Sequence, residues 1–321
     1  MEKLKVTVLA FSMSLLIVLV LMPFIISFFR KKQLGQMTRD EGPSWHQEKS
    51  GTPTMGGLAF IFSSALTIAL ITIFNLEGLA DVLPLITFFV SFGMIGFVDD
   101  YIKLIMKRNL GLSSKQKFIA QLLMAIFFYI VLLATGFDNE LNLAFMGNIN
   151  ISYLYGLFTV FWLVGFSNAT NLTDGIDGLL GSTSVIAYSA YAYIAYTQEN
   201  LGVLLFALSV IGGLVGFLFF NKKPAEIFMG DVGSLALGAG LAAMSILLNV
   251  EWTMIFIGII FVIETASVIL QVTYFKKTGK RIFKMSPIHH HFEMEGWSEL
   301  KIVSIFSFLG LLGALISLPF I

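Results

Sequence analysis

The sequence has no cysteine, and charged residues occupy only 12% of its 321 positions, about half of their share in an ordinary soluble domain. The lack of cysteine excludes disulfide bonds, zinc–thiolate sites and a cysteine nucleophile. Hydrophobic residues account for 57% of the chain, and the mean hydropathy is +0.86. They form long blocks rather than the period-2 or period-3.6 stripes of soluble strands and helices. This composition predicts an integral membrane protein.

Ten of the apolar blocks are long enough to cross a bilayer as helices, which takes about 20 residues and tolerates about 17. An open sheet edge in hydrocarbon would leave backbone groups unpaired, so helices are expected. The predicted fold class is therefore all-α, a polytopic transmembrane protein with a single domain over residues 1–321. The predicted spans are 6–29, 55–74, 82–98, 118–135, 153–169, 178–196, 202–220, 235–250, 253–275 and 302–320.

Basic residues are distributed very unevenly among the loops between these spans. Of the 20 Lys and Arg residues, all but Lys3 and Lys5 follow the first, third, seventh or ninth span. Loops rich in Lys and Arg stay in the cytoplasm, so these four loops are predicted to be cytoplasmic and both termini to lie outside. The polar clusters of the sequence fall on the same predicted cytoplasmic face, which suits a polar substrate from the cytosol.

Five aspartates lie at the predicted cytoplasmic ends of spans: Asp99, Asp100, Asp174, Asp177 and Asp231. Asp99 and Asp100 end the third span, where a pair of charges could simply mark the water boundary. Asp174 and Asp177 are three residues apart and share a helical face, although a capped helix start would also account for them. Asp231 lies in a glycine-flanked turn. Carboxylates brought together raise one another's pKa unless a cation intervenes, and oxygen ligands suit Mg²⁺.

Three consecutive histidines, His289, His290 and His291, follow Pro287 in the last basic segment. Zinc is a minor alternative, because consecutive helical residues point about 100° apart and three zinc ligands would need an irregular backbone. Imidazoles that hydrogen-bond phosphate oxygens fit this basic loop better. Glu264 lies near the middle of the ninth span, where an ionised carboxylate costs roughly 2.5–3.5 kcal/mol unless it faces protein or water. Both a structural and a catalytic role are open for Glu264.

Five motifs lie at residues 49–57, 99–100, 171–178, 228–234 and 287–293. In this order they resemble the motifs of the bacterial phospho-N-acetylmuramoyl-pentapeptide transferase family, within the superfamily of polyprenyl-phosphate sugar-phosphate transferases. The resemblance runs through almost the whole chain, including the ten-span layout. The aspartate motifs are shared across the superfamily. The Gly-Thr-Pro-Thr-Met-Gly-Gly stretch and the unbroken histidine triplet resemble the muramoyl-pentapeptide branch in particular.

The resemblance implies a reaction in the bacterial cytoplasmic membrane, the first membrane step of peptidoglycan synthesis. UDP-N-acetylmuramoyl-pentapeptide and undecaprenyl phosphate, a membrane lipid, give lipid I and UMP with Mg²⁺ as cofactor. A homodimer is one option for the assembly, and nucleic acid is not an expected partner. The resemblance also implies that the ninth span breaks or bends and opens a groove for the prenyl chain.

The site residues are carried over by motif. Asp231 is the expected Mg²⁺ ligand, with Asp99 as the base or activator of the lipid phosphate and Asp100 assisting it. A covalent aspartyl-phosphate route stays open as an alternative. Lys115 and the three histidines are expected to hold diphosphate oxygens. Substrate binding is assigned to a set that surrounds the nucleoside, in which Phe228 offers uracil an aromatic face: Lys49, Thr54, Asn171, Asp174, Asp177, Asn221, Phe228 and Ser234.

Two other functions fit parts of the pattern. A sister transferase that uses an N-acetylhexosamine nucleotide, for example in teichoic acid or antigen initiation, would share the aspartate motifs. A nucleotide-sugar or ion transporter is the more distant alternative. Transporters place their polar groups near the bilayer midplane, whereas here the polar clusters crowd one predicted surface and Glu264 alone is deep. That distribution favours an enzyme that works at the membrane surface.

Overall fold

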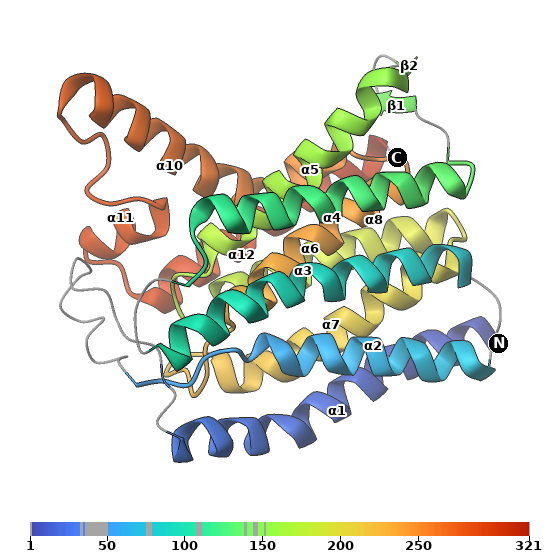
Figure 1. Ribbon diagram of the computed structural model, residues 1–321, viewed down its shortest axis with the longest axis horizontal. Coiled ribbons are helices and arrows are strands. Elements are labelled where there is room, and N and C mark those ends of the chain that lie inside the picture. The colour runs from blue at the N-terminus through green and yellow to red at the C-terminus, as the bar shows by residue number, and fades with distance from the viewer. Residues whose placement is uncertain are drawn as a thin grey trace.

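The computed structural model describes residues 2–32, 35, 51–74, 79–106, 111–137, 140–143, 147–150 and 152–320, and Lys49 lies outside them. The described chain is a bundle of helices with one short β-hairpin (Figure 1). The longer helices are α1 (Glu2–Lys31), α2 (Gly57–Phe74), α3 (Leu79–Ile105), α4 (Ser114–Ala134), α5 (Ser152–Thr173), α6 (Leu179–Thr197), α7 (Leu201–Asn221), α8 (Gly230–Leu247), α10 (Ile259–Thr278) and α12 (Glu299–Ser317). The short elements are β1 (Glu140–Leu143), β2 (Gly147–Asn150), α9 (Thr253–Ile257), α11 (Ile288–Met294) and the 3₁₀ turn η2 (Leu318–Phe320).

Each predicted span coincides with helix in the structure, which confirms the all-α membrane class. Among the described residues, seven helices are long and apolar enough to cross a bilayer: α1, α3, α4, α7, α8, α10 and α12. The full count of ten spans stays a prediction. The ninth predicted span is divided at Gly258 into α9 and α10, as the family resemblance implied. Segment 136–152, predicted as a loop, contains the antiparallel pair β1 and β2.

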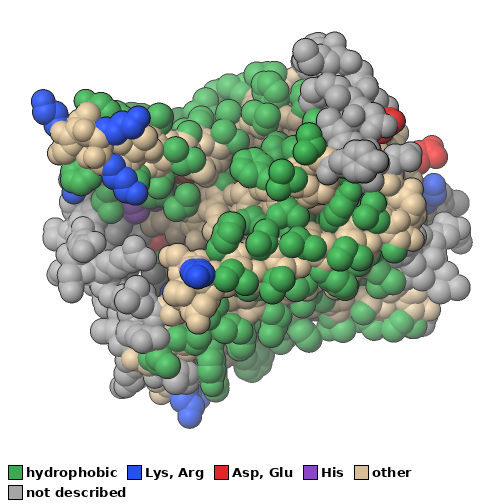
Figure 2. All heavy atoms as spheres, turned by 45° about the horizontal axis from the view of Figure 1, so that its top comes forward, with side chains coloured by type: hydrophobic (Ala, Val, Ile, Leu, Met, Phe, Trp, Pro, Cys, Tyr) green, Lys and Arg blue, Asp and Glu red, His purple; other side chains and the backbone are tan. Residues whose placement is uncertain are grey.

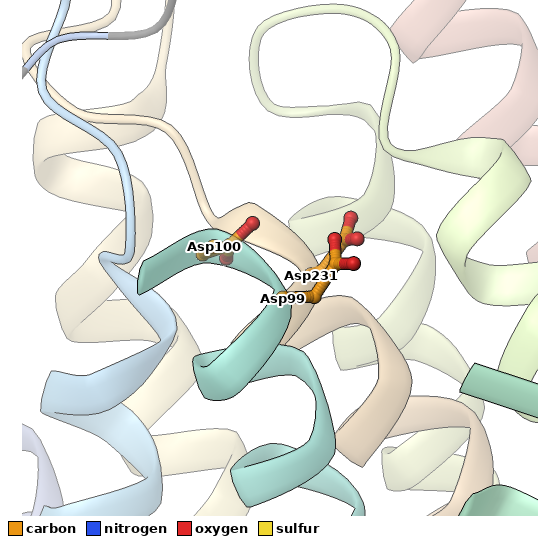
Figure 3. Close-up of side chains that lie close together, drawn as sticks. All are labelled: Asp99, Asp100 and Asp231. Atoms are coloured by element: carbon orange, nitrogen blue, oxygen red, sulfur yellow. The ribbon is translucent and has the colours of Figure 1, made fainter. Parts of the chain in front are cut away.

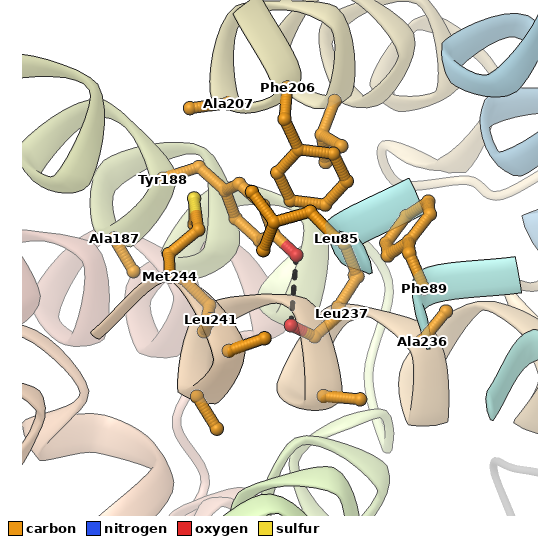
Figure 4. Close-up of a cluster of buried hydrophobic side chains, with 14 of the residues drawn as sticks. Leu85, Phe89, Ala187, Tyr188, Phe206, Ala207, Ala236, Leu237, Leu241 and Met244 are labelled. Atoms are coloured by element: carbon orange, nitrogen blue, oxygen red, sulfur yellow. Dashed lines mark hydrogen bonds between the residues drawn. The ribbon is translucent and has the colours of Figure 1, made fainter. Parts of the chain in front are cut away.

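The helix at the centre of the bundle is α8, which packs most extensively against α3 and α5 (Figure 1). Small residues allow this close packing. At Gly238 a β-carbon would overlap the backbone carbonyl of Phe166 on α5. The Tyr188 hydroxyl on α6 donates a 2.9 Å hydrogen bond to the Leu237 carbonyl on α8, within the apolar cluster of Figure 4. These contacts hold α8 in a fixed position, and α8 begins at the functional site.

Large apolar side chains lie exposed on the outer faces of the helices. On α4, for example, Leu123 and Ile130 are 60% and 55% exposed. Figure 2 shows hydrophobic side chains over the middle of the molecule and Lys and Arg mostly at the end that carries α11. In water so large an apolar surface would favour aggregation, whereas in a bilayer it faces lipid. Both chain termini lie at the end of the bundle opposite α11 (Figure 1).

Candidate active site

Three aspartates converge where α3 ends and α8 begins. Asp99 and Asp100 lie in the last turns of α3, and Asp231 lies in the first turn of α8 (Figure 3). Each offers a carboxylate oxygen, and these oxygens lie within 4.8 Å of one another. The close approach of the two helices depends on Gly96, where a β-carbon would overlap the backbone carbonyl of Asp231. The structure therefore brings together carboxylates that are about 130 residues apart in the chain.

Two lysines compensate this concentration of negative charge. The Lys103 ammonium lies 2.6 Å from Asp99 Oδ2, 3.4 Å from Asp100 Oδ1 and 3.0 Å from Asp231 Oδ2. The Lys117 ammonium lies 2.7 Å from Asp231 Oδ2. Sequence reasoning missed both residues as site residues. Lys103 follows Asp99 by four residues on one helix, a spacing typical of ion pairs, and that signal could have revealed it.

Lys117 has no such local signal, because its partner is on another helix. The position of Lys117 follows from the start of α4, where a capping box joins Ser113 and Gln116: the Ser113 hydroxyl accepts from the Gln116 amide at 3.2 Å, and Gln116 Oε1 accepts from the Ser113 amide at 3.0 Å. Lys115, the residue predicted for this segment, is exposed, and no contact joins it to the three carboxylates within the described ranges. The phosphate-binding role of Lys115 stays a prediction.

Backbone amides and one side-chain amide orient the three carboxylates. Asp99 Oδ1 accepts from the Leu112 amide at 2.7 Å, and Asp100 Oδ2 accepts from the Val232 amide at 3.2 Å. Adjacent residues on α3 thus bond to different elements, as expected from the 100° between their directions. Such bonds hold the oxygens in place before any ligand arrives.

Asn171, at the end of α5, supports Asp231 directly. Its side-chain amide donates to Asp231 Oδ1 and to the Ser234 hydroxyl, both at 2.8 Å. Asn171 and Ser234 were predicted to bind substrate; in the structure Asn171 bonds to the carboxylate that was predicted to bind Mg²⁺, and Ser234 bonds to Asn171. The donor set of the three aspartates is made of oxygens, which are the ligands of Mg²⁺ when phosphate oxygens complete its coordination. The residues present therefore fit a magnesium ion.

A second cluster surrounds the turn between α5 and α6, which contains Asp174 and Asp177. Asp177 is buried, and its Oδ2 accepts from the Ala225 amide at 3.1 Å. Asn221, at the end of α7, accepts from the Gly178 amide at 3.0 Å and donates to the Ile227 carbonyl at 3.0 Å. Asp177 and Asn221 thus join the α5–α6 turn to the segment between α7 and α8.

Asp174 is less firmly held and is electrostatically coupled to the first cluster. The pKa of the Asp174 carboxyl is raised to about 8, mainly by burial and in addition by the negative charges of Asp231, Asp100 and Asp177. A cation or a hydrogen-bond donor brought near this carboxyl would favour its charged form. The α5–α6 turn therefore has a carboxyl that can release a proton when a ligand binds.

The segment that carries Thr54 pairs with the segment that carries Phe228. The Phe228 amide donates to the Pro53 carbonyl at 2.8 Å, and the Gly56 amide donates to the Phe228 carbonyl at 2.9 Å. Thr54 is buried beside Gly230, whereas the Phe228 ring is half-buried. Two motifs far apart in the sequence thus meet next to Asp231.

The three histidines lie on α11, and their Nδ1 atoms have three different partners. His289 Nδ1 lies 3.0 Å from Glu264 Oε1, and both side chains are fully buried. His290 Nδ1 lies 2.6 Å from Glu293 Oε2, and His291 Nδ1 accepts from the Lys284 amide at 3.2 Å. The three rings therefore have separate environments. His289 packs against Gly175 of the α5–α6 turn, which connects α11 with the second cluster.

Comparison with known proteins agrees with this geometry. Residues 82–249 match the model of glycosyl transferase family 4, and residues 49–61 match phospho-N-acetylmuramoyl-pentapeptide-transferase signature 1. The chain is 51% identical to the phospho-N-acetylmuramoyl-pentapeptide-transferase of Lactobacillus gasseri over 96% of this chain and 97% of that protein. The enzymes of the same name from Listeria monocytogenes and Lactobacillus delbrueckii subsp. bulgaricus are also 51% identical, over 96% and 97% of this chain and 95% and 97% of theirs.

Proposed function

The chain belongs to the phospho-N-acetylmuramoyl-pentapeptide transferase family, and we propose that it makes lipid I. The donor is UDP-N-acetylmuramoyl-pentapeptide, the acceptor is undecaprenyl phosphate, and the second product is UMP. One observation carries this proposal: aspartates from two of the family motifs converge at one end of the bundle, where Asn171 of a third motif and two lysines contact them. The exposed apolar faces of the helices suit a substrate that is itself a membrane lipid.

In this reaction an oxygen of the lipid phosphate attacks the β-phosphorus of the donor, and the bond to UMP breaks. Both reactants are anions, so catalysis depends mainly on charge neutralisation and in-line positioning. Lys103 and Lys117 supply two ammonium groups at the aspartate cluster, and in the proposal they move from carboxylate to phosphate oxygens. Asp231 would hold Mg²⁺, with Asp100 close enough to contribute, and the bound ion would supply positive charge to the phosphate oxygens.

Asp99 is proposed to activate the lipid phosphate. Its Oδ1 is held by the Leu112 amide, and its Oδ2 contacts Lys103. A lipid phosphate is already partly ionised near neutral pH, with a second pKa of about 6, so a base assists the reaction without being essential. The donor's nucleoside is assigned to the α5–α6 turn with Asp174, and to Phe228, whose half-buried ring offers a stacking face.

We also propose that the site end of the bundle faces the cytoplasm. The connections α3–α4, α7–α8 and α10–α11 lie at this end, and together with the helix turns that flank them they hold most of the described Lys and Arg residues outside α1. Cysteines placed singly in this cysteine-free chain can be labelled with an impermeant maleimide in intact cells. Labelling at positions 140 and 200 but not at 110 and 280 is expected, and the reverse pattern would contradict the orientation.

Mass spectrometry of the lipid product tests the reaction itself. Purified protein, UDP-N-acetylmuramoyl-pentapeptide and undecaprenyl phosphate should yield undecaprenyl-diphospho-N-acetylmuramoyl-pentapeptide and UMP. A competing UDP-N-acetylhexosamine in the same assay distinguishes a sister transferase, which would give the lipid-linked hexosamine instead.

A further inference from the structure

A carboxylate and an imidazole, both fully buried, connect the broken ninth span to the histidine segment. Glu264 lies on α10 and His289 on α11, and neither side chain is exposed. Glu264 Oε1 lies 3.0 Å from His289 Nδ1. A carboxylate accepts hydrogen bonds, so Nδ1 carries the ring proton and donates a hydrogen bond to Glu264. The bond therefore fixes both the ring orientation and the identity of the remaining nitrogen, Nε2.

His289 Nε2 is buried and has no hydrogen-bond partner within the part of the chain that the structure describes. A buried polar atom without a partner costs about 1–3 kcal/mol, so a group outside the described protein atoms is expected to complete this bond. Nε2 points at Gly175 in the α5–α6 turn, where a β-carbon would overlap it. This contact gives a physical reason for glycine at position 175, beside Asp174.

The His289 ring also has a second histidine beside it. The His290 ring lies 4.0 Å from the His289 ring, centroid to centroid, and itself contacts Glu293. Asp174 directly precedes Gly175 in the α5–α6 turn. The carboxylate that contacts the His289 ring directly is Glu264, which comes from a different helix. Orientation of His289 toward the turn thus depends on Glu264.

We propose that Glu264 is a positioning residue: it holds His289 so that Nε2 faces the α5–α6 turn and bonds an oxygen of the bound nucleotide donor. The inference rests on the proposed function, which places the donor at this turn. Glu264 itself touches neither substrate and acts through His289. Because α10 follows the break at Gly258, this hydrogen bond and the packing of His289 against Gly175 link the ninth span to the donor-binding turn.

The test measures steady-state kinetics of Glu264→Ala and Glu264→Gln with both substrates varied. For Glu264→Ala, the KM for UDP-N-acetylmuramoyl-pentapeptide should rise, or kcat/KM for it fall, by about 10–100-fold, as when the partner that orients a ligating histidine is lost. The KM for undecaprenyl phosphate should change little. Glu264→Gln should recover much of the loss, because the amide oxygen can still accept from Nδ1.

Glu251→Gln is the matched control. Glu251 is also fully buried and accepts a hydrogen bond from Tyr155, but it lies beyond the far end of α8, roughly 25 Å from Asp231 by helix length. Its kinetic constants should match those of the wild type. A loss in Glu251→Gln as large as that in Glu264→Ala, or a Glu264→Gln variant no better than Glu264→Ala, would overturn the proposal.

A second, independent test substitutes Gly175 and measures donor binding by calorimetry. Gly175→Ala should weaken donor binding in the wild-type chain, yet add no further loss in a His289→Ala background, because the overlapping ring is then absent. Equal losses of donor binding in both backgrounds would show that the contact between His289 and Gly175 has no role in binding. If the wild-type protein fails to form lipid I, the proposed function falls, whereas an active wild type with an unaffected Glu264→Ala variant refutes this inference alone.

Discussion

Replacing Asp231 by asparagine separates the catalytic role of this carboxylate from its structural role. Asparagine has nearly the same shape as aspartate. Its Oδ1 can still accept the hydrogen bond from the Asn171 side chain, which is 2.8 Å long to Asp231. What disappears is one negative charge and the charge-assisted bonds from Lys103 at 3.0 Å and Lys117 at 2.7 Å. Bonds of this kind are worth about 1.5–3 kcal/mol each.

The lost bonds are offset by relief of repulsion. The three aspartates offer oxygens within 4.8 Å of one another, and two unit charges at that distance repel by roughly 3–4 kcal/mol at an effective dielectric constant of about 20. Asp231 takes part in two such pairs. The two effects are opposite in sign and of the same order, so the unfolding free energy of Asp231→Asn should stay within a few kcal/mol of the wild type.

Turnover should respond very differently. Loss of a ligand to a catalytic ion removes several kcal/mol of transition-state stabilisation, so kcat should fall by roughly 10²–10⁴-fold. The assay is UMP release over a Mg²⁺ titration, with thermal unfolding in detergent measured on the same preparation. Higher Mg²⁺ should recover part of the activity. Wild-type turnover of Asp231→Asn at limiting Mg²⁺ would refute the assignment of this residue as the ligand.

Three further predictions concern neighbouring groups. Asp99→Asn should lower turnover by roughly 10²–10⁴-fold, as for a positioned acid–base group, with little change in donor affinity by calorimetry; stoichiometric UMP release without lipid acceptor would instead indicate a covalent route. Lys117→Met should reduce kcat far more than Lys115→Met in the same UMP assay, since Lys117 contacts Asp231; equal losses would contradict the geometry. The raised pKa of Asp174, about 8 against an ordinary 3.8, means that the folded protein keeps a proton that the unfolded chain releases. Without Mg²⁺ and donor, thermal stability should therefore fall as pH rises from about 4 to about 8, and Asp174→Asn should flatten that profile; an unchanged slope would exclude Asp174 as its source.

Features set by local composition could be predicted from the sequence alone. The length of an apolar block decides whether it can span a bilayer, and α1 and α12 lie where the blocks predicted them. The nearness of Asp99 to Asp100 and the glycines around Asp231 are likewise visible in the chain itself. A break or bend in the ninth span was expected only from the family resemblance, and its position at Gly258 came from the structure, because a glycine within an apolar run is not by itself a reliable helix terminus.

The tertiary structure decided which of these residues meet. Lys117 contacts Asp231 and Lys115 does not, because the cap at Ser113 and the packing of α4 set the direction of each side chain. Asp177 and Asn221, predicted around the nucleoside, bond to the backbone of each other's segments. Glu264 finds its partner 25 residues away in His289. Such pairings depend on the angles and distances between helices, which arise from packing over the whole bundle and leave no periodic signal in any one segment.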